Sequence, residues 1–259
     1  IYGLNFYNSC VRINEDLKLG FNCPEAKEIN SQPILTVAKN NIEMPQNKQL
    51  GVKLRRWSNC DHMYWTIKYD LKEDHLKYYN IFPVQYVFLG DNIIWTHSDD
   101  NPIYAYMFYK DNKYYYKIYR PLSPDRQYKW MSSTNRTVLQ GWDQLPEFGE
   151  TLILTKSLKD VAVYRTLNLY ALACQNEVSM VKNTVMDDLK RRFKRIVINQ
   201  DYDPAGIQGT EALAKEYNLP YYYLKDGDKD ISDYKEWHTR RETITLVKSK
   251  LREVWPGLY

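Results

Sequence analysis

Two carboxylates stand close together directly after an apolar run in the last third of the chain. Residues 196–198 are Ile, Val and Ile, and they are followed by Asp201 and Asp203, after which Pro204 opens a helix-like segment. Open α/β sheets bind ligands at the carboxyl ends of their strands, and two acids there form a hard-oxygen site of the kind that Mg²⁺ or Mn²⁺ prefers. A second interpretation stays open, in which Asp203 caps the helix that begins at Pro204 and Asp201 belongs to a loop.

The elements around this pair alternate between strands and helices. Short apolar runs predict strands at residues 152–154, 170–174, 196–198 and 221–224, and helical spacing predicts helices at 158–167, 180–192, 204–217 and 231–255. Asn168 fits the left-handed position that ends a helix. Strands separated by helices of this size predict a mainly parallel, Rossmann-like α/β sheet with helices on both faces. We expect this domain over residues 149–237, followed by a C-terminal helix over 238–259.

The first half of the chain has a different pattern. Residues 60–148 are rich in Tyr, Trp and Ile, and they predict strands at 85–89, 103–109 and 114–119 and a short helix at 74–79. Asp111 and Asn112 lie between the last two strands and predict a hairpin turn. This pattern favours an α+β subdomain. Residues 1–59 are expected to form a helix, over residues 1–20, and then a linker or irregular arm.

Basic residues in this first half are mixed with aromatic ones. The net charge of +4 is small, but the aromatic content of 15% includes 24 tyrosines. Lys and Arg beside Tyr and Trp suit a single nucleic-acid strand, which needs phosphate neutralisation and surfaces for base stacking. A plain solvated face is the alternative, and the stem of Arg56 has a rival role in packing. The candidates for nucleic-acid or nucleotide binding are Arg55, Arg56, Lys117, Arg120 and Lys129.

The cysteines, the histidines and the apolar stretches of the chain bear on zinc binding and on the cellular compartment of the protein. No cysteine belongs to a CxxC pair and no histidine lies at ligand spacing, so the sequence predicts no structural zinc. We expect no signal peptide and no membrane-spanning segment, because no apolar stretch is long enough to cross a membrane. These features predict a cytoplasmic protein with no membrane partner. The chain starts at Ile1 within a helix-like pattern, which predicts a fragment of a longer protein.

The acidic segment resembles the second motif of the TOPRIM domain, which bacterial and phage primases share with topoisomerases and some nucleases. The order of strands and helices is also similar. The first motif of TOPRIM primases reads Glu-Gly-x-x-Asp-Val; Asp160 and Val161 match it, but Lys156 stands in place of the glutamate. The late acidic motif of the family corresponds to the segment that holds Asp230 and Asp233. The resemblance implies that Asp201 and Asp203 bind metal and that Asp160 and Asp230 assist them. For Asp233 a role in the helix cap is an equal alternative.

Looser similarities extend through the first half of the chain. Phe82 and Pro83 resemble a core segment of phage primases, residues 116–120 and 139–141 resemble the run that leads into the first TOPRIM strand, and residues 13–17 resemble the segment after the zinc module of such proteins. The resemblance implies that the chain is the catalytic core of a phage-type DNA primase that uses Mg²⁺ or Mn²⁺. Its template would be single-stranded DNA, its substrates ribonucleoside triphosphates and its partner a replicative helicase. The protein would then lie in the host cytoplasm. A TOPRIM nuclease and a TOPRIM nucleic-acid-binding protein that has lost activity are the alternatives.

Lys156 requires a special explanation, because a protonated lysine cannot bind a cation. One hypothesis makes Glu177 the replacement ligand or base, since it follows the strand at residues 170–174 and strand-end loops converge at one edge of a sheet. Lys156 would then bind the triphosphate. In the alternative interpretation, Glu177 is a solvated loop residue or a first-turn helix charge.

Overall fold

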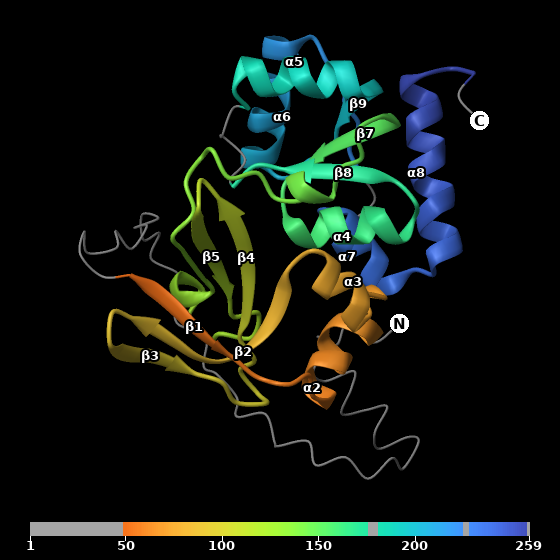
Figure 1. Cartoon of the computed structure of the whole chain (residues 1–259). Helices are drawn as coiled ribbons and strands as arrows, with labels where there is room; N and C mark the ends of the chain where they lie inside the picture. The colour runs from red at the N-terminus through yellow and green to blue at the C-terminus, as the bar shows by residue number, and fades with distance from the viewer. Residues whose placement is uncertain (1–48, 176–180, 225–227, 258–259) are drawn as a thin grey trace, which may run out of the picture. The chain divides into compact units, whose positions relative to one another are not determined.

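Two β-sheets with surrounding helices make up the part of the chain that the computed structural model describes, residues 49–175, 181–224 and 228–257, all within one compact unit (Figure 1). The N-terminal half contains the elements β1 Leu50–Leu54, α2 Asn59–Asp61, the π-helix His62–Ile67, α3 Glu73–Tyr78, β2 Ile81–Leu89, β3 Asn92–Thr96, β4 Tyr104–Lys110, β5 Lys113–Tyr119 and β6 Trp130–Ser132. The C-terminal half contains β7 Gly149–Thr155, α4 Leu158–Thr166, β8 Tyr170–Ala173, α5 Asn183–Arg192, β9 Phe193–Ile198, α6 Pro204–Tyr217, α7 Ile231–Trp237 and α8 Arg240–Val254.

The first sheet is antiparallel, with strand order β1-β2-β4-β5-β6 and with β3 paired to β2. The predicted hairpin between β4 and β5 is confirmed: Asp111 and Asn112 both have positive φ, at 50° and 57°, as in the tight turns that match the twist of a hairpin. The linker or irregular arm expected up to residue 59 needs correction in its described part, because β1 pairs with β2 and belongs to the sheet. Its side chains are mostly exposed or half-buried, so it lacks the apolar pattern of a buried strand.

The second sheet is parallel, with order β8-β7-β9, and helices cover both of its faces as predicted. Its side chains alternate between two cores. Ile153 and Val197 face the core that contains α4, α7 and α8, whereas Leu152 and Ile196 face the core that contains α5 and α6 (Figure 1). Burial on both faces explains why these strands read as continuous apolar runs.

Three details of this half differ from or extend the sequence predictions. The strand predicted at residues 221–224 is wrong, because only Tyr221 forms a bridge, to Ile198. Ile198 is the last residue of β9, so the residues after Tyr221 have no strand to pair with. Asn168 has φ 61°, which confirms the left-handed position after α4. The helix predicted from residue 180 begins at Asn183.

In the N-terminal half, the helix predicted at residues 1–20 lies outside the described residues.

One hydrophobic core joins the two sheets. It contains Tyr104 and Tyr119 from the antiparallel sheet together with Ile153 and Val161 from β7 and α4. The two halves therefore pack through buried side chains on the side of the parallel sheet where α4 lies. In the described residues, no helix has both the length and the apolar character needed to cross a bilayer.

Candidate metal centre and nucleic-acid surface

Three carboxylates meet beyond the carboxyl ends of the parallel strands. Asp160 lies in the first turn of α4, which follows β7; Asp201 follows β9; and Asp230 is the N-cap of α7. One oxygen from each lies within 4.8 Å of the others. Asp160 is 1% exposed and Asp201 2% exposed, so this negative charge is held away from water. Such a cluster needs counter-charge or a cation, because like charges in a poorly solvated place repel.

Short hydrogen bonds fix the Asp160 carboxylate in place. The Ser157 hydroxyl donates to its Oδ2 at 2.6 Å, and the Ser232 hydroxyl donates to its Oδ1. Ser157 also caps α4, since its oxygen accepts the Asp160 backbone N–H at 3.2 Å. Asp230 in turn accepts the Asp233 N–H at 2.8 Å, which holds the start of α7. The caps of two helices therefore orient two of the three carboxylates.

Asp203 lies outside this group of three and caps α6. Its Oδ1 accepts the Gly206 N–H at 2.8 Å, and its Oδ2 lies 2.7 Å from the Lys229 ammonium. A methyl group on Gly206 would lie 2.1 Å from the Asp201 carbonyl oxygen, so only glycine lets α6 start this close to the loop. The capping interpretation of Asp203 therefore describes its observed contacts, and its link to the carboxylate group runs through Lys229.

Two lysines contact the carboxylates. The ammonium of Lys156 donates to Asp201 Oδ2, and the ammonium of Lys229 lies 2.9 Å from the same oxygen. The other oxygen of Asp201, Oδ1, is buried and has no hydrogen-bond partner among the described residues. Lys156 thus occupies one side of the key aspartate and leaves the other side for a ligand.

The site raises the pKa of its most buried acids. Burial, and then repulsion from Asp230, raises the pKa of Asp160 to about 7 and that of Asp233 to about 6. Burial also raises the pKa of Asp201, against hydrogen bonds from Lys156 and Lys229. For Asp203, burial alone would raise the pKa, but the hydrogen bonds from Lys229 and the Gly206 N–H outweigh it and lower the pKa.

A divalent cation fits this chemistry. The donors are carboxylate oxygens, which hard cations such as Mg²⁺ and Mn²⁺ select. An ion there would pair with the orphaned Asp201 Oδ1 and would relieve the repulsion that raises the pKa of Asp160. The residues that would hold it are Asp160, Asp201 and Asp230.

Basic and aromatic side chains gather on β5 and β6. Tyr119 and Trp130 stack with ring centroids 4.1 Å apart, and Trp130 remains 37% exposed. The ammonium of Lys117 lies 5.0 Å from the Trp130 ring centre, and that of Lys129 lies 5.8 Å from the Tyr119 ring centre. Burial and repulsion from neighbouring cations, Lys159 first among them, lower the pKa of Lys129. The predicted candidates Lys117 and Lys129 therefore flank one aromatic stack.

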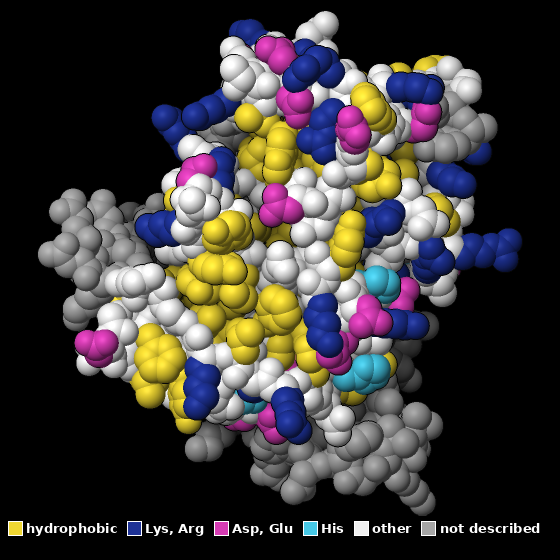
Figure 2. All heavy atoms as spheres, viewed as in Figure 1, with side chains coloured by type: hydrophobic (Ala, Val, Ile, Leu, Met, Phe, Trp, Pro, Cys, Tyr) yellow, Lys and Arg dark blue, Asp and Glu magenta, His cyan; other side chains and the backbone are white. Residues whose placement is uncertain are grey.

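The predicted arginines have three different environments. Arg55 makes two short contacts with Asp61, at 2.6 and 2.7 Å, so its guanidinium serves an internal ion pair rather than an open surface. Arg56 is exposed. Arg120 packs its guanidinium 4.5 Å from the Trp95 ring centre, and burial lowers its pKa. Figure 2 shows Lys and Arg side chains around the margin of one face, with hydrophobic side chains gathered over the region of β4 and β5.

The sequence analysis missed two lysines and could not place one glutamate. Lys229 contacts both Asp201 and Asp203, and its position next to Asp230 in the late acidic segment was the available signal. Lys159 lies 4.6 Å from the Tyr69 ring centre; burial acts to lower its pKa, but charge interactions with Tyr69 and Asp230 outweigh burial and raise it. Its position beside Asp160 in the sequence gave the same kind of signal. Glu177 lies outside the described residues.

No protein-family model and no curated protein matches the chain by sequence. Solved structures do match it. The DnaG catalytic core has a TM-score of 0.57 and 13% identity, over 75% of this chain and 73% of that one. The DnaG primase catalytic domain bound to ssDNA has a TM-score of 0.51 and 13% identity, over 76% and 73%. The primase fragment of the bacteriophage T7 primase-helicase protein has a TM-score of 0.49 and 12% identity, over 71% and 72%.

The two matches with a TM-score above 0.5 define the class of fold. The chain is an α/β protein with the fold of the DnaG catalytic core: a parallel sheet between helices, preceded by a subdomain built on an antiparallel sheet. This confirms the fold that the sequence resemblance implied.

Proposed function

We propose that this chain is the catalytic core of a DNA primase, which joins ribonucleotides into a short primer on single-stranded DNA. The observation that carries the proposal is the group of three buried or half-buried carboxylates at the strand ends of a fold like that of the DnaG catalytic core. The sequence resemblance to phage primases supports the same activity, and one of the similar solved structures is described as bound to ssDNA.

In this proposal Asp160, Asp201 and Asp230 hold Mg²⁺ or Mn²⁺. A divalent ion there supplies charge neutralisation for triphosphate oxygens and activation of the attacking 3′-hydroxyl. Lys156 and Lys229 neutralise Asp201 in the chain as it stands. Once the carboxylates face an ion, the two ammonium groups are placed beside it and suit phosphate oxygens. Asp203 keeps α6 and Lys229 in position.

The template in this proposal lies along β5 and β6. Single strands bind through stacking on exposed rings and through cations that follow the phosphates. Trp130, with Lys117 and Lys129 on either side of the Tyr119–Trp130 stack, offers both. Arg120 directly follows β5 and remains a candidate for contact with the strand, whereas Arg56 follows β1 at the other edge of the sheet and remains a separate candidate. A replicative helicase as partner follows from the sequence resemblance alone.

Incubation with single-stranded DNA, labelled ribonucleoside triphosphates and Mn²⁺ or Mg²⁺ tests the proposal. We expect short labelled products that need both template and metal and that disappear in Asp201→Asn. Degradation of the DNA would support a TOPRIM nuclease instead. Binding of DNA without any product would support an inactive protein, the alternative favoured by the Lys156 contact with Asp201.

A further inference from the structure

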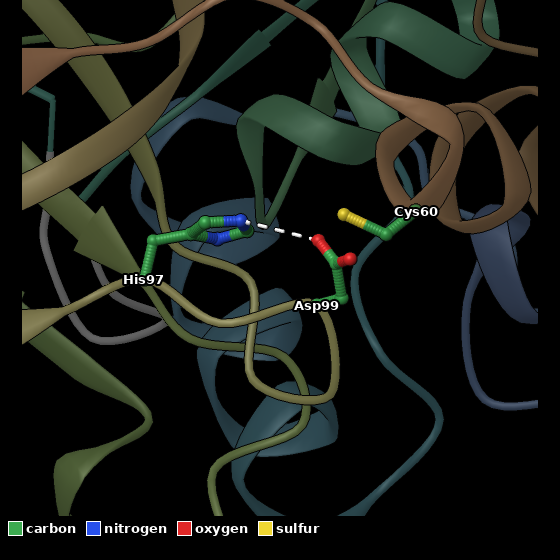
Figure 3. A group of neighbouring side chains, drawn as sticks. All are labelled: Cys60, His97 and Asp99. Carbon is green, nitrogen blue, oxygen red and sulfur yellow. Dashed lines mark ion pairs between the residues drawn. The ribbon is translucent and has the colours of Figure 1, made fainter.

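A second group of ligand-type side chains lies in the N-terminal half, apart from the three carboxylates. It consists of Cys60 in α2 and of His97 and Asp99, which follow β3. A sulfur, a nitrogen and an oxygen of these residues lie within 4.8 Å of one another. Figure 3 shows the three groups pointing toward one another from two separate segments of the chain. The sequence analysis predicted no structural zinc because it used the spacing of cysteine and histidine along the sequence. That spacing does not reveal that Cys60, His97 and Asp99 come together in the fold.

The backbone around the group is well held. The His97 N–H donates to the Gln85 carbonyl at 2.9 Å, which continues the pairing of β3 with β2. A bridge between Ser98 and Asn101 closes a tight turn that presents Asp99. The histidine Nε2 already lies 3.4 Å from Asp99 Oδ1, a separation close to that between two ligands on one small ion. Only small side-chain rotations would bring all three donors onto one cation.

The region around Cys60 supplies charge balance. Arg55 lies 4.0 Å from the Cys60 sulfur, and on its own it would oppose a cation. However, both of its terminal nitrogens are paired with Asp61. A thiolate at Cys60 and the carboxylate of Asp99 would therefore provide two negative charges for a divalent ion.

We propose that Cys60, His97 and Asp99 form a zinc site that joins α2 to the turn after β3. One sulfur, one imidazole nitrogen and one carboxylate oxygen are the donors that Zn²⁺ takes, and three protein ligands leave a fourth position for water. This site differs in kind from the all-oxygen carboxylate centre, which suits Mg²⁺ or Mn²⁺. The inference goes beyond the proposed function and does not depend on it.

The alternative role for these residues is a catalytic site in which Cys60 is the nucleophile. The contacts of the Cys60 sulfur oppose this role. A nucleophilic cysteine needs a general base within hydrogen-bond reach, but the Cys60 sulfur lies 3.2 Å from the Ser58 hydroxyl, and the His97 Nε2 lies 3.4 Å from Asp99 Oδ1.

Cobalt(II) in place of zinc gives the sharpest test, because thiolate bound to cobalt produces a charge-transfer absorption. The whole chain, freed of metal and titrated with Co²⁺, should bind one equivalent with this absorption and lose it on addition of Zn²⁺. Cys60→Ser and His97→Ala should each abolish the absorption. Cys174→Ser is the matched control, as are Cys10→Ser with Cys23→Ser, and all of these should keep it. Asp201→Asn should also keep it, so this result is separable from the carboxylate centre.

A second measurement on the unaltered chain guards against variants that fail to fold. Zn²⁺ should slow alkylation of Cys60 by iodoacetamide at least about tenfold, measured on the Cys60 peptide by mass spectrometry, while Cys174 serves as the internal reference. Equal alkylation rates with and without Zn²⁺ would overturn the proposal. So would a cobalt–thiolate absorption that survives Cys60→Ser or is lost in the Cys10 and Cys23 double variant.

Discussion

The buried Asp160 carboxyl should make the stability of this protein fall as pH rises. Burial and repulsion from Asp230 raise its pKa from 3.8 to about 7. A raised pKa means that the folded state binds the proton more tightly than the unfolded state does. Stability is therefore intact below about pH 4 and is lost progressively up to about pH 7. Each pH unit in this window is worth about 1.4 kcal/mol, so the full loss is about 4 kcal/mol.

Asp160→Asn isolates this effect, because the amide resembles the protonated carboxyl and does not titrate. We expect the variant to gain about 4 kcal/mol of unfolding free energy relative to the parent chain between about pH 4 and about pH 8. Urea unfolding followed by circular dichroism, with a chelator present, measures this difference. Asp187→Asn, at an exposed position on α5, should show no such dependence. An equal effect of Asp160→Asn at every pH would refute the reasoning.

Three further expectations concern single residues. Lys156→Gln removes the ammonium that contacts Asp201, and it should therefore tighten Mn²⁺ binding about tenfold, or about 1.4 kcal/mol, as measured by calorimetry. Unchanged affinity would mean that the Lys156 contact does not compete with metal. Gly206→Ala should cost about 1 to 3 kcal/mol in unfolding free energy, because its methyl would meet the Asp201 carbonyl oxygen, whereas Gly51→Ala, with its nearest atom at 3.8 Å, should cost far less. Arg55→Ala should lower stability by about 3 to 5 kcal/mol by leaving its buried partner unpaired, and a folded variant with weaker DNA binding instead would restore the predicted surface role. 

The template surface predicts a separate loss. Trp130→Ala should weaken single-stranded DNA binding by about 1 to 3 kcal/mol, as expected when one stacked base loses its ring. Tyr109→Ala, at an exposed ring on β4, is the matched control. Fluorescence anisotropy with a labelled oligonucleotide measures both, and equal losses in the two variants would mean that DNA does not stack on Trp130.

The elements of the parallel half could be predicted because each carries a local signal. Strands buried on both faces are continuous apolar runs, and α6 has Asp203 as cap, Pro204 in its first turn and Asn218 in the left-handed position after its end. The strand predicted at residues 221–224 failed for a reason that lies elsewhere in the chain. β9 leaves the sheet after Ile198 to form the loop of Asp201, which removes the partner that the next strand would need.

The contacts of the site were less accessible to sequence reasoning. The position of Asp201 after an apolar strand drew attention to it, and Asp160 and Asp230 were candidates through the family resemblance. Which of two nearby aspartates faces the group and which caps a helix depends on the backbone direction after β9, and spacing alone leaves that open. The ion pair between Arg55 and Asp61 could not be predicted for a similar reason. A basic residue near aromatic residues gives the same sequence pattern whether its side chain lies on an open surface or in an internal ion pair.

Titration with Mn²⁺, followed by electron paramagnetic resonance of the free ion, tests most directly whether Asp160, Asp201 and Asp230 hold a divalent cation. The parent chain should bind Mn²⁺ in competition with Mg²⁺. Asp201→Asn should abolish this binding with the circular dichroism spectrum intact, while Asp203→Asn should weaken it much less, because Lys229 is what links Asp203 to the group among the residues that the structure describes. Binding that is unchanged in Asp201→Asn, or lost only in Asp203→Asn, would contradict the account.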